Sequence, residues 1–171
     1  NGLVYGGSGS DTALLYGSGY FDSGLLRQFE SGLKAGSGTY TLPELPVSVV
    51  EVVEGTLLVD SDYAFSPEGR YTAHVNPDGN CGVLAINGTA SLSGDLNVIA
   101  QRGVYLDGTK YGVLASGRAD GAFNRVNLPG SAILTFNSEQ GADGLDVEVD
   151  VASFKTVADT AAEEAIGAYL D

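Results

Sequence analysis

The stretch that decides the fold is Ile86-Asn-Gly-Thr-Ala-Ser-Leu-Ser-Gly-Asp-Leu-Asn-Val98. It reads as short apolar runs separated at tight intervals by turn residues such as Asn-Gly and Ser-Gly-Asp. Strands of about three residues make poor hairpin arms, because hairpins need longer strands to be stable. They are adequate for a β-solenoid, in which short strands stack coil upon coil and a glycine-rich corner follows each strand.

The same punctuation runs along most of the chain. Glycine contributes 25 of the 171 residues, about twice its usual share, and it falls between short alternating runs. These runs are 55–59, 71–75, 83–86, 90–92, 96–98, 111–114, 132–136 and 145–151. A sandwich or barrel is the alternative all-β architecture, but it needs strands of about five or six residues. We therefore expect an all-β solenoid.

Coils of roughly 20–25 residues predict about seven coils up to Phe154. A rod of this kind has two open ends, and each needs a neighbour or a cap, because an exposed strand edge invites aggregation. The less regular segment 60–80 is predicted to form a hairpin-like excursion, with turns at Pro67 and at 77–79.

The pattern changes after Phe154. Apolar pairs recur every four residues from 157 to 170, with polar pairs between them, which predicts an amphipathic helix over 155–171. Thr156 is its expected N-cap, and Asp159 stands at the capping-box position. Fifteen helical residues would span about 22 Å.

Charge and composition exclude several functions. The chain has 8 Lys+Arg against 22 Asp+Glu, a formal net charge of −14, which argues against nucleic-acid binding. One cysteine excludes a disulfide framework and a Cys-based zinc site. No apolar run approaches the ~18 residues of a membrane-spanning helix. The absence of methionine, with Asn1 first, is expected of a fragment or a processed product.

Four stretches, taken in order, resemble the C-terminal end of a bacterial autotransporter passenger (type V secretion). The first, Asp11-Thr-Ala-Leu-Leu15 followed by Phe29-Glu-Ser-Gly-Leu-Lys34 and Gly36-Ser-Gly-Thr-Tyr-Thr-Leu42, is similar to the family pattern "DTL … FE.L.K.GSGTWTL". The second, Val52-Val-Glu-Gly-Thr-Leu-Leu-Val59, resembles the rung "v..GTL.V". The chain departs from the family in having Tyr40 where tryptophan is common, and in the prolines of 42–46.

The third stretch, which runs from Gly69 to Leu114 through Gly88-Thr-Ala-Ser-Leu92, is the most specific and resembles "l.V.GtA.L.G.L.V … Y..gt.Y.vL". The fourth includes Gly121-Ala-Phe123, the run around Phe136 and the alternating segment 145–151, and is similar to the family's approach to its translocator barrel.

This resemblance implies a right-handed parallel β-helix stem over 1–154, whose last coils (about 60–154) form a junction or autochaperone region. It also implies a linker helix over 155–171 that threads an outer-membrane β-barrel. The implied partners are the chain's own upstream passenger domain and that downstream barrel. The implied location is the bacterial cell surface or outer membrane, or a secreted passenger. The implied function is non-catalytic: folding, export and surface display of the passenger.

Two motifs suggest a chemical role, one in calcium binding and one in glycoside hydrolysis. The segment Gly6-Gly-Ser-Gly-Ser-Asp-Thr-Ala-Leu14 matches one copy of a calcium-binding nonapeptide, but such sites need stacked copies that share six or more oxygen ligands. A glycine corner is the expected role. Asp60 and Asp62 could form a carboxylate pair for glycoside hydrolysis, yet no basic or aromatic cluster accompanies them.

The remaining candidates favour structural roles. His74 is out of phase with its apolar neighbours and is expected to face solvent. Cys81 is expected to pack rather than react, and the acids of 145–151 should line an outer strand face. Asn87-Gly-Thr89 is a glycosylation sequon by pattern only. The nine tyrosines and six phenylalanines are spread along the chain, which favours packing roles over a carbohydrate platform.

The sequence therefore predicts no catalytic, cofactor-binding or metal-ligating residue, and no cofactor. Two alternatives to the structural module stay open. One is an adhesin or carbohydrate-binding β-helix whose partner is a host surface or glycan. The other is a β-helix polysaccharide lyase or hydrolase that depends on Asp60.

Overall fold

The computed structural model describes residues 3–153 and the separate positions 158, 160, 163 and 166. The helix expected over 155–171, with its N-cap Thr156, thus lies outside the described residues apart from these four positions. Among them, Thr160 Oγ1 accepts a hydrogen bond from the Glu163 N–H (3.2 Å) and bonds the Glu163 carboxylate (2.9 Å). The bond from the Glu163 N–H to Thr160 Oγ1 is the one that an N-cap threonine accepts.

Two parallel sheets form the body of the molecule. In the first, six strands lie in the order β14-β12-β10-β7-β5-β2, and all are parallel. Their bounds are β2 (Thr12–Tyr16), β5 (Ser31–Ala35), β7 (Val49–Val52), β10 (Arg70–Val75), β12 (Asp95–Ala100) and β14 (Arg125–Asn127). The register partners are 18 residues apart between β5 and β7 (Ser31 and Val49) and 30 apart between β12 and β14 (Asp95 and Arg125).

The second sheet has eight strands, with the path β15-β16-β13-β11-β8-β6-β3 and with β9 beside β11. The bounds are β3 (Gly19–Tyr20), β6 (Thr39–Leu42), β8 (Gly55–Val59), β9 (Tyr63–Ala64), β11 (Gly82–Leu92), β13 (Lys110–Gly121), β15 (Leu134–Gln140) and β16 (Gly144–Val151). A small outlying pair joins β1 (Val4–Tyr5) to β4 (Leu26–Arg27), next to the 3₁₀ turn Ser23–Leu25.

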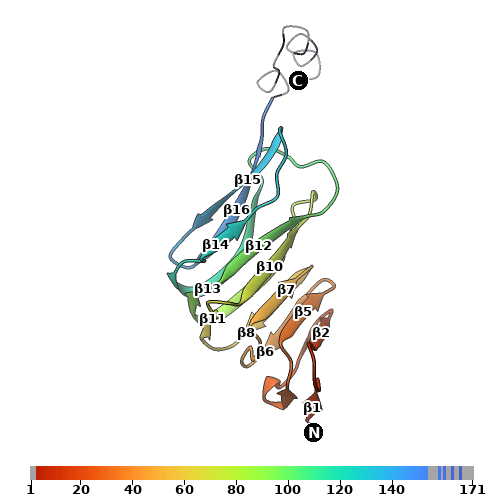
Figure 1. The fold of residues 1–171 in the computed structure, drawn as a ribbon, viewed down its shortest axis with the longest axis vertical. Helices are drawn as coiled ribbons and strands as arrows, with labels where there is room; N and C mark the ends of the chain where they lie inside the picture. The colour runs from red at the N-terminus through yellow and green to blue at the C-terminus, as the bar shows by residue number, and fades with distance from the viewer. Residues whose placement is uncertain (1–2, 154–157, 159, 161–162, 164–165, 167–171) are drawn as a thin grey trace.

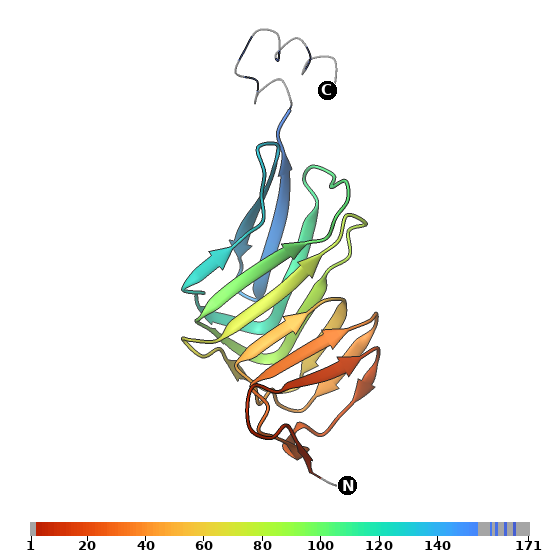
Figure 2. The same ribbon diagram turned by 45° about the vertical axis from the view of Figure 1, so that its right-hand side comes forward.

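The chain alternates between the two sheets, so that each coil adds one rung to each wall (Figure 1). The rungs rise from β1 at one end of the long axis to β15 at the other (Figures 1 and 2). The all-β prediction and the stack of short parallel strands are confirmed, and the arrangement is that of a β-solenoid. The first sheet has six rungs where seven coils were expected, because the chain after β14 forms the antiparallel hairpin of β15 and β16 on the second sheet and adds no further rung to the first.

The core lies between the walls and is filled from alternate strand positions. Val50, Val52, Leu57, Val59 and Leu84 are 0% exposed. Each such side chain contributes roughly 1.5–3 kcal/mol by leaving water. β-Branched residues are frequent here because they fit a pleated, half-buried surface.

Aromatic rings fill the wider C-terminal coils. Phe65 contacts Tyr63 edge-on with ring centroids 4.7 Å apart and contacts Phe123 at 5.1 Å. Tyr71 is completely buried, and its hydroxyl accepts a hydrogen bond from the Leu84 N–H (3.1 Å) and donates to the Val113 carbonyl (2.6 Å). The packing role expected for the aromatic residues is confirmed for these residues.

The C-terminal end abandons parallel pairing. β16 pairs antiparallel with β13 on one side and with β15 on the other. The two-residue period predicted for 145–151 is confirmed up to Val149: Leu145, Val147 and Val149 are buried, and the acids between them face outward, but Val151 at the end of the strand is exposed.

Two details of the predicted strand pattern are wrong. Segment 60–80 is no excursion over most of its length, because β9 and β10 are regular rungs paired on the sheets. Only the turn 76–80 projects, closed by the Asn76 N–H on the Asn80 carbonyl (2.8 Å). The runs 83–86 and 90–92 belong to one strand, β11, which a register shift between Ile86 and Thr89 interrupts.

Candidate functional site

The two ends of the solenoid differ, and the N-terminal end is open. β2 and β3 are the last strands of their sheets, so each leaves one edge of its backbone without a neighbouring strand. β14, at the opposite end of the first sheet, also has one unpaired edge, whereas the strands between β14 and β2 are paired on both sides. An exposed parallel edge is a template on which a further strand can pair.

The core is also open at this end. A cavity of about 260 Å³ lies there, lined mainly by apolar side chains that include Leu15, Phe21, Phe29 and Tyr40. Tyr40 is in register with Leu57, which points into the core, yet Tyr40 itself is only half-buried. The register partner of Tyr40 on the terminal strand β3 is Gly19, which has no side chain to cover the ring.

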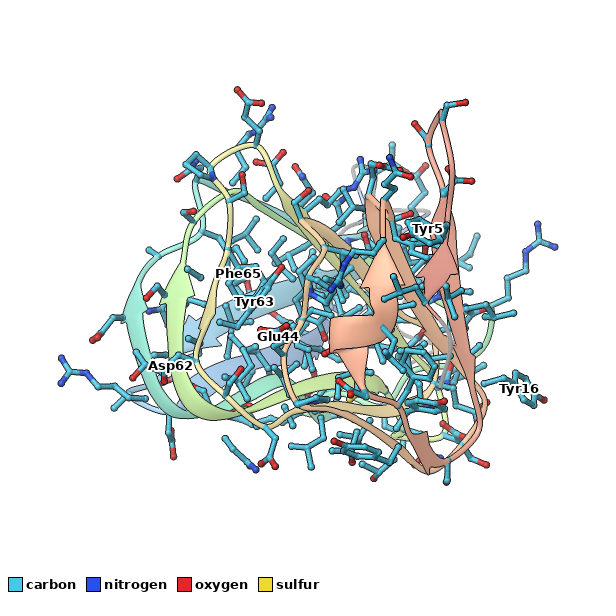
Figure 3. All side chains as sticks on the ribbon, turned by 90° about the horizontal axis from the view of Figure 1, so that it is seen from below. Tyr5, Tyr16, Glu44, Asp62, Tyr63 and Phe65 are labelled. Carbon is cyan, nitrogen blue, oxygen red and sulfur yellow. The ribbon has the colours of Figure 1, made fainter. Side chains whose placement is uncertain are left out.

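Apolar side chains surround this opening. The large exposed ones are Leu3, Val4, Tyr5, Leu14, Tyr16 and Tyr20. Figure 3 views the molecule from this end, with Tyr16 extending outward at the right edge and Tyr5 at a separate place over the ribbon. Tyr5 and Tyr16 therefore do not form a pair of rings that would hold a sugar between them.

The C-terminal end also has free strand edges, on β14 and β15, but these differ from β2 and β3 in length, direction and charge. β14 has only three residues, and the antiparallel hairpin of β15 and β16 covers the end of the second sheet. The outer face of the hairpin is acidic, and Lys110 bridges Glu148 (3.2 Å) and Glu139 (3.7 Å) across it. The hydrogen bond and charge of Glu148 raise the pKa of Lys110. Short, charged and antiparallel strands are the usual protection against edge-to-edge pairing.

Asp60 and Asp62 do not form a catalytic pair. Asp60 accepts a hydrogen bond from the Asn87 side-chain amide, and Asp62 accepts one from the Thr89 N–H (2.6 Å). Both carboxylates therefore bond residues of the next coil, at the point where the register of β11 shifts. Asp62 also borders a groove of about 580 Å³, on the same side as Glu44 and Tyr63.

His74 is placed differently from its prediction. It points out of the first sheet as expected, but it is only 8% exposed. Its Nε2 lies 2.8 Å from Glu51 Oε1 on β7, and its Nδ1 lies 2.8 Å from the Gln101 amide nitrogen. The expectation that it faces solvent is wrong, because side chains on the two neighbouring rungs cover the ring.

Cys81 packs at the edge of the core, and burial raises the pKa of its thiol to about 11. A thiol with a raised pKa is a poor nucleophile, which agrees with a packing role. The segment 6–10 joins β1 to β2, and Asp11 is held by its N–H on Glu30 (2.8 Å). Within the described residues no three His, Cys, Asp or Glu side chains gather as a metal site would require.

Lys34 is a buried cation that was not predicted from the sequence. Lys34 is 0% exposed, and its Nζ donates to the carbonyls of Ala35 (3.2 Å), Gly36 and Glu54 (3.1 Å). Desolvation lowers its pKa, and the charge of Glu54 opposes this. The signal was present in the strand phase, since Gly32 and Lys34 share the inward face of β5.

No helix among the described residues is long and apolar enough to cross a membrane. No protein-family model matches this chain, and no curated protein matches its sequence.

Proposed function

We propose that this chain is a non-catalytic structural module: the right-handed parallel β-helix stem and junction of an autotransporter passenger. In this proposal residues of about 60–154 act as the autochaperone region, and 155–171 is the linker helix toward the outer-membrane barrel. The module supports folding, export and surface display of the passenger. Its partners are the upstream passenger domain and the barrel.

The observation that carries the proposal is the difference between the two ends. The N-terminal end has unpaired parallel edges and an uncovered core, whereas the C-terminal end is blunted by an antiparallel, acidic hairpin. The five-residue parallel edge of β2 and the uncovered core both lie at the N-terminal end, whereas the free parallel edge at the other end, on β14, has only three residues, so a further coil is accommodated best at the N-terminal end. Since each coil is stabilised mainly by its neighbours, the finished C-terminal coils would template the coil that precedes them.

The order of secretion fits this polarity. In the proposed export route the C-terminal coils emerge first and fold at the cell surface. The next coil pairs on β2 and β3 and covers the part of the core around Tyr40 that Gly19 leaves open. Each later coil then pairs on the coil before it. The carboxylates of Asp60 and Asp62 accept hydrogen bonds from Asn87 and Thr89 on the following coil. Side-chain bonds of this kind would help to hold each new coil on the one already folded.

The test is to place this chain between a β-helix passenger and an autotransporter barrel, and to measure surface display and trypsin resistance of the passenger. Tyr40→Lys puts a charge where the next coil should cover the core. We expect it to reduce the protease-resistant displayed passenger by about tenfold, because burying an unpaired charge is costly. Tyr16→Lys, which points outward from the same region, is the matched control and should have little effect.

The proposal fails if Tyr40→Lys leaves display and trypsin resistance equal to wild type while the chain itself stays folded. It fails equally if Tyr40→Lys and Tyr16→Lys reduce them to the same extent, because exposed charge alone would then be responsible.

A further inference from the structure

The outer face of the first sheet contains a groove that the proposed stem function does not use. It has a volume of about 450 Å³ and lies over β7, β10, β12 and β14. This volume falls within the range typical of small-ligand sites. Its lining mixes polar side chains with the apolar Val49, Ile99, Leu128 and Pro129.

The parallel register builds the polar part of the groove. Glu51, Thr72, Asn97 and Asn127 are successive register partners on four rungs, so they form one row across the sheet. Arg70 begins the adjacent row and is followed by Asp95 and Arg125. Side chains in such rows stand only one strand spacing apart, about 4.8 Å.

Thr72 is the unusual member of this row. As a whole residue it is only 7% exposed, and it lines the groove. Its hydroxyl oxygen is not one of the fully buried atoms without a partner, which in the described residues are Asp11 Oδ2 and Ser116 Oγ. The hydroxyl is therefore accessible from the groove, and it has no hydrogen-bond partner among the described residues. A ligand group seated in the groove would supply that partner.

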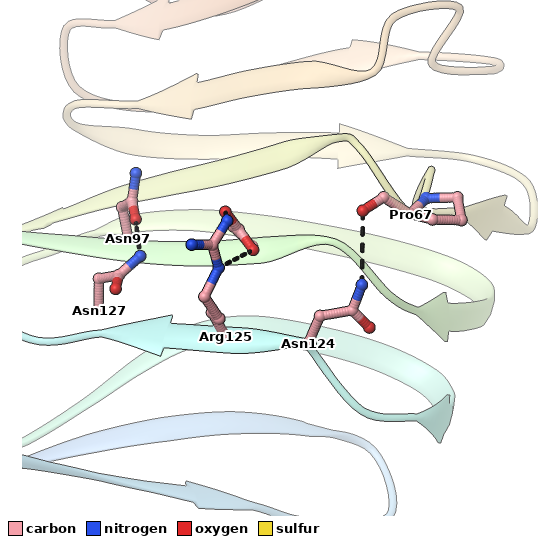
Figure 4. Close-up of polar contacts among 6 residues, drawn as sticks. Pro67, Asn97, Asn124, Arg125 and Asn127 are labelled. Atoms are coloured by element: carbon pink, nitrogen blue, oxygen red, sulfur yellow. Dashed lines mark hydrogen bonds and ion pairs between the residues drawn. The ribbon is translucent and has the colours of Figure 1, made fainter.

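The neighbours of Thr72 are fixed but keep spare hydrogen-bonding capacity, as Figure 4 shows for part of the row. Asn127 Nδ2 donates to Asn97 Oδ1 (2.7 Å), which leaves the amide nitrogen of Asn97 and the amide oxygen of Asn127 available. Arg125 holds Asp95 through two bonds (3.1 and 2.9 Å). Asp95 is therefore occupied, while Arg70 has no partner within the described part of the chain.

Glu51 is oriented from the other side. One carboxylate oxygen is fixed by His74, whose second ring nitrogen contacts Gln101. The second carboxylate oxygen of Glu51 has no partner among the described residues. The buried histidine thus acts as a positioning residue for an acceptor at the edge of the groove.

The acidic, basic, amide and hydroxyl side chains of the groove together indicate which class of ligand it favours. An anion would meet Glu51 and a chain of net charge −14, and a cation would meet Arg70. An apolar ligand would leave the amides and Thr72 unpaired, which disfavours it. Sugar hydroxyls both donate and accept, and the C–H faces of a sugar ring can lie on Ile99 and Pro129.

We propose that this groove binds a neutral carbohydrate, with Thr72, Asn97 and Asn127 contacting its hydroxyl groups. The site is separate from the open end of the solenoid, so carbohydrate binding and the stem function can fail independently. A carbohydrate-binding stem could attach a displayed passenger to a glycan.

The experiment is an NMR titration of the ¹⁵N-labelled full chain with cellohexaose, maltohexaose, xylohexaose and mannohexaose, and with hexagalacturonate as the acidic probe. We expect at least one neutral hexasaccharide to shift the amide signals of β10, β12 and β14. Thr72→Val should weaken that binding roughly tenfold, the effect of losing one buried polar contact. Valine suits a strand, so this variant should fold.

Two further variants make the result specific. Asn127→Ala changes an exposed side chain on the same groove and should also weaken binding. Thr41→Val makes the Thr72 change at a half-buried position on the second sheet and should leave binding unchanged.

Three outcomes overturn the proposal: no neutral hexasaccharide shifts any signal of the first sheet, only hexagalacturonate binds, or Thr72→Val and Thr41→Val weaken binding equally.

Discussion

At the scale of single residues, Lys34 shows how the solenoid tolerates a buried charge. Its ammonium group has no carboxylate within salt-bridge distance in the described structure, and it is surrounded by carbonyls of two successive coils. Carbonyl oxygens compensate only part of the hydration that a cation loses, which is why desolvation lowers its pKa. The charge is accommodated at the coil corner, where backbone carbonyls point inward.

This predicts a pH dependence of stability. Because the pKa of Lys34 is lower in the folded state than in the unfolded state, the unfolded state binds more protons between the two values, and stability rises with pH in that window. We expect the free energy of unfolding of wild type, relative to Lys34→Met, to increase as the pH approaches 10.5, the ordinary value. Urea unfolding of both proteins between pH 8 and pH 10.5 measures the difference.

Lys110 provides a control, because its pKa is shifted in the opposite direction from that of Lys34. Its pKa is raised by Glu148 and Glu139, so its contribution is present below the ordinary pKa and is lost as the pH rises through the folded value. The difference between wild type and Lys110→Met should therefore decrease with pH. Parallel slopes for the two lysine variants would contradict the explanation from burial.

The exposure of single side chains could not be predicted from the sequence. The phase of β10 correctly places His74 outside the core, but its exposure depends on Glu51 and Gln101, which lie 23 and 27 residues away in sequence. Thr72 is buried in the same way, between neighbouring rungs. A periodic pattern assigns a residue to a face of the sheet, but the cover on that face comes from other coils. For this reason the groove on the outer face of the first sheet could not be predicted from the sequence.

At the scale of elements, the coil corners depend on close backbone approach. Gly94 precedes β12 with φ of 69°, and a Cβ there would lie 2.5 Å from the carbonyl oxygens of Gly69 and Ser66. Gly108 has nearly the same φ, 71°, but a Cβ there would meet nothing within 4 Å. A comparison of alanine substitutions at Gly94 and Gly108 therefore distinguishes the cost of backbone strain, which both share, from the cost of steric contact, which only Gly94 has.

We expect Gly108→Ala to cost about 1–2 kcal/mol, the price of a left-handed conformation for a residue with a Cβ. Gly94→Ala should cost about 1–3 kcal/mol more, because backbone atoms of the previous coil must also move. Thermal unfolding of the two variants measures this. Equal losses would mean that the stacking at this corner is looser than the structure shows.

A strand can be predicted from the sequence when apolar and polar residues alternate along it without interruption. Strand β16 was predicted from sequence because one of its faces is apolar and the other acidic, which gives a clear two-residue period. Strand β11 was divided in two because Asn87-Gly88 is a turn signal, and here it forms an irregularity inside a strand, held by Asp60 and Asp62. Local turn chemistry cannot distinguish a corner from a bulge, since the distinction depends on pairing with the next coil.

At the scale of the whole molecule, the stack has a direction. Each coil contacts chiefly the coils before and after it, so local stability should follow the number of covered neighbours. β11 and β13 are long and lie between paired strands, whereas β2 and β3 are terminal and border an uncovered cavity. The open end that supports the export proposal should therefore also be the least protected part of the two main sheets.

Hydrogen exchange followed by mass spectrometry tests this polarity on the isolated chain. We expect amides of β2 and β3 to exchange at least tenfold faster than those of β11 and β13, because opening the last rung breaks one interface while opening an inner rung breaks two. Fusing an upstream β-helix coil should slow exchange in β2 and β3 and leave β11 and β13 unchanged. Uniform protection along the isolated chain would show that the coils open together, and a directional templating mechanism would then lose its physical basis.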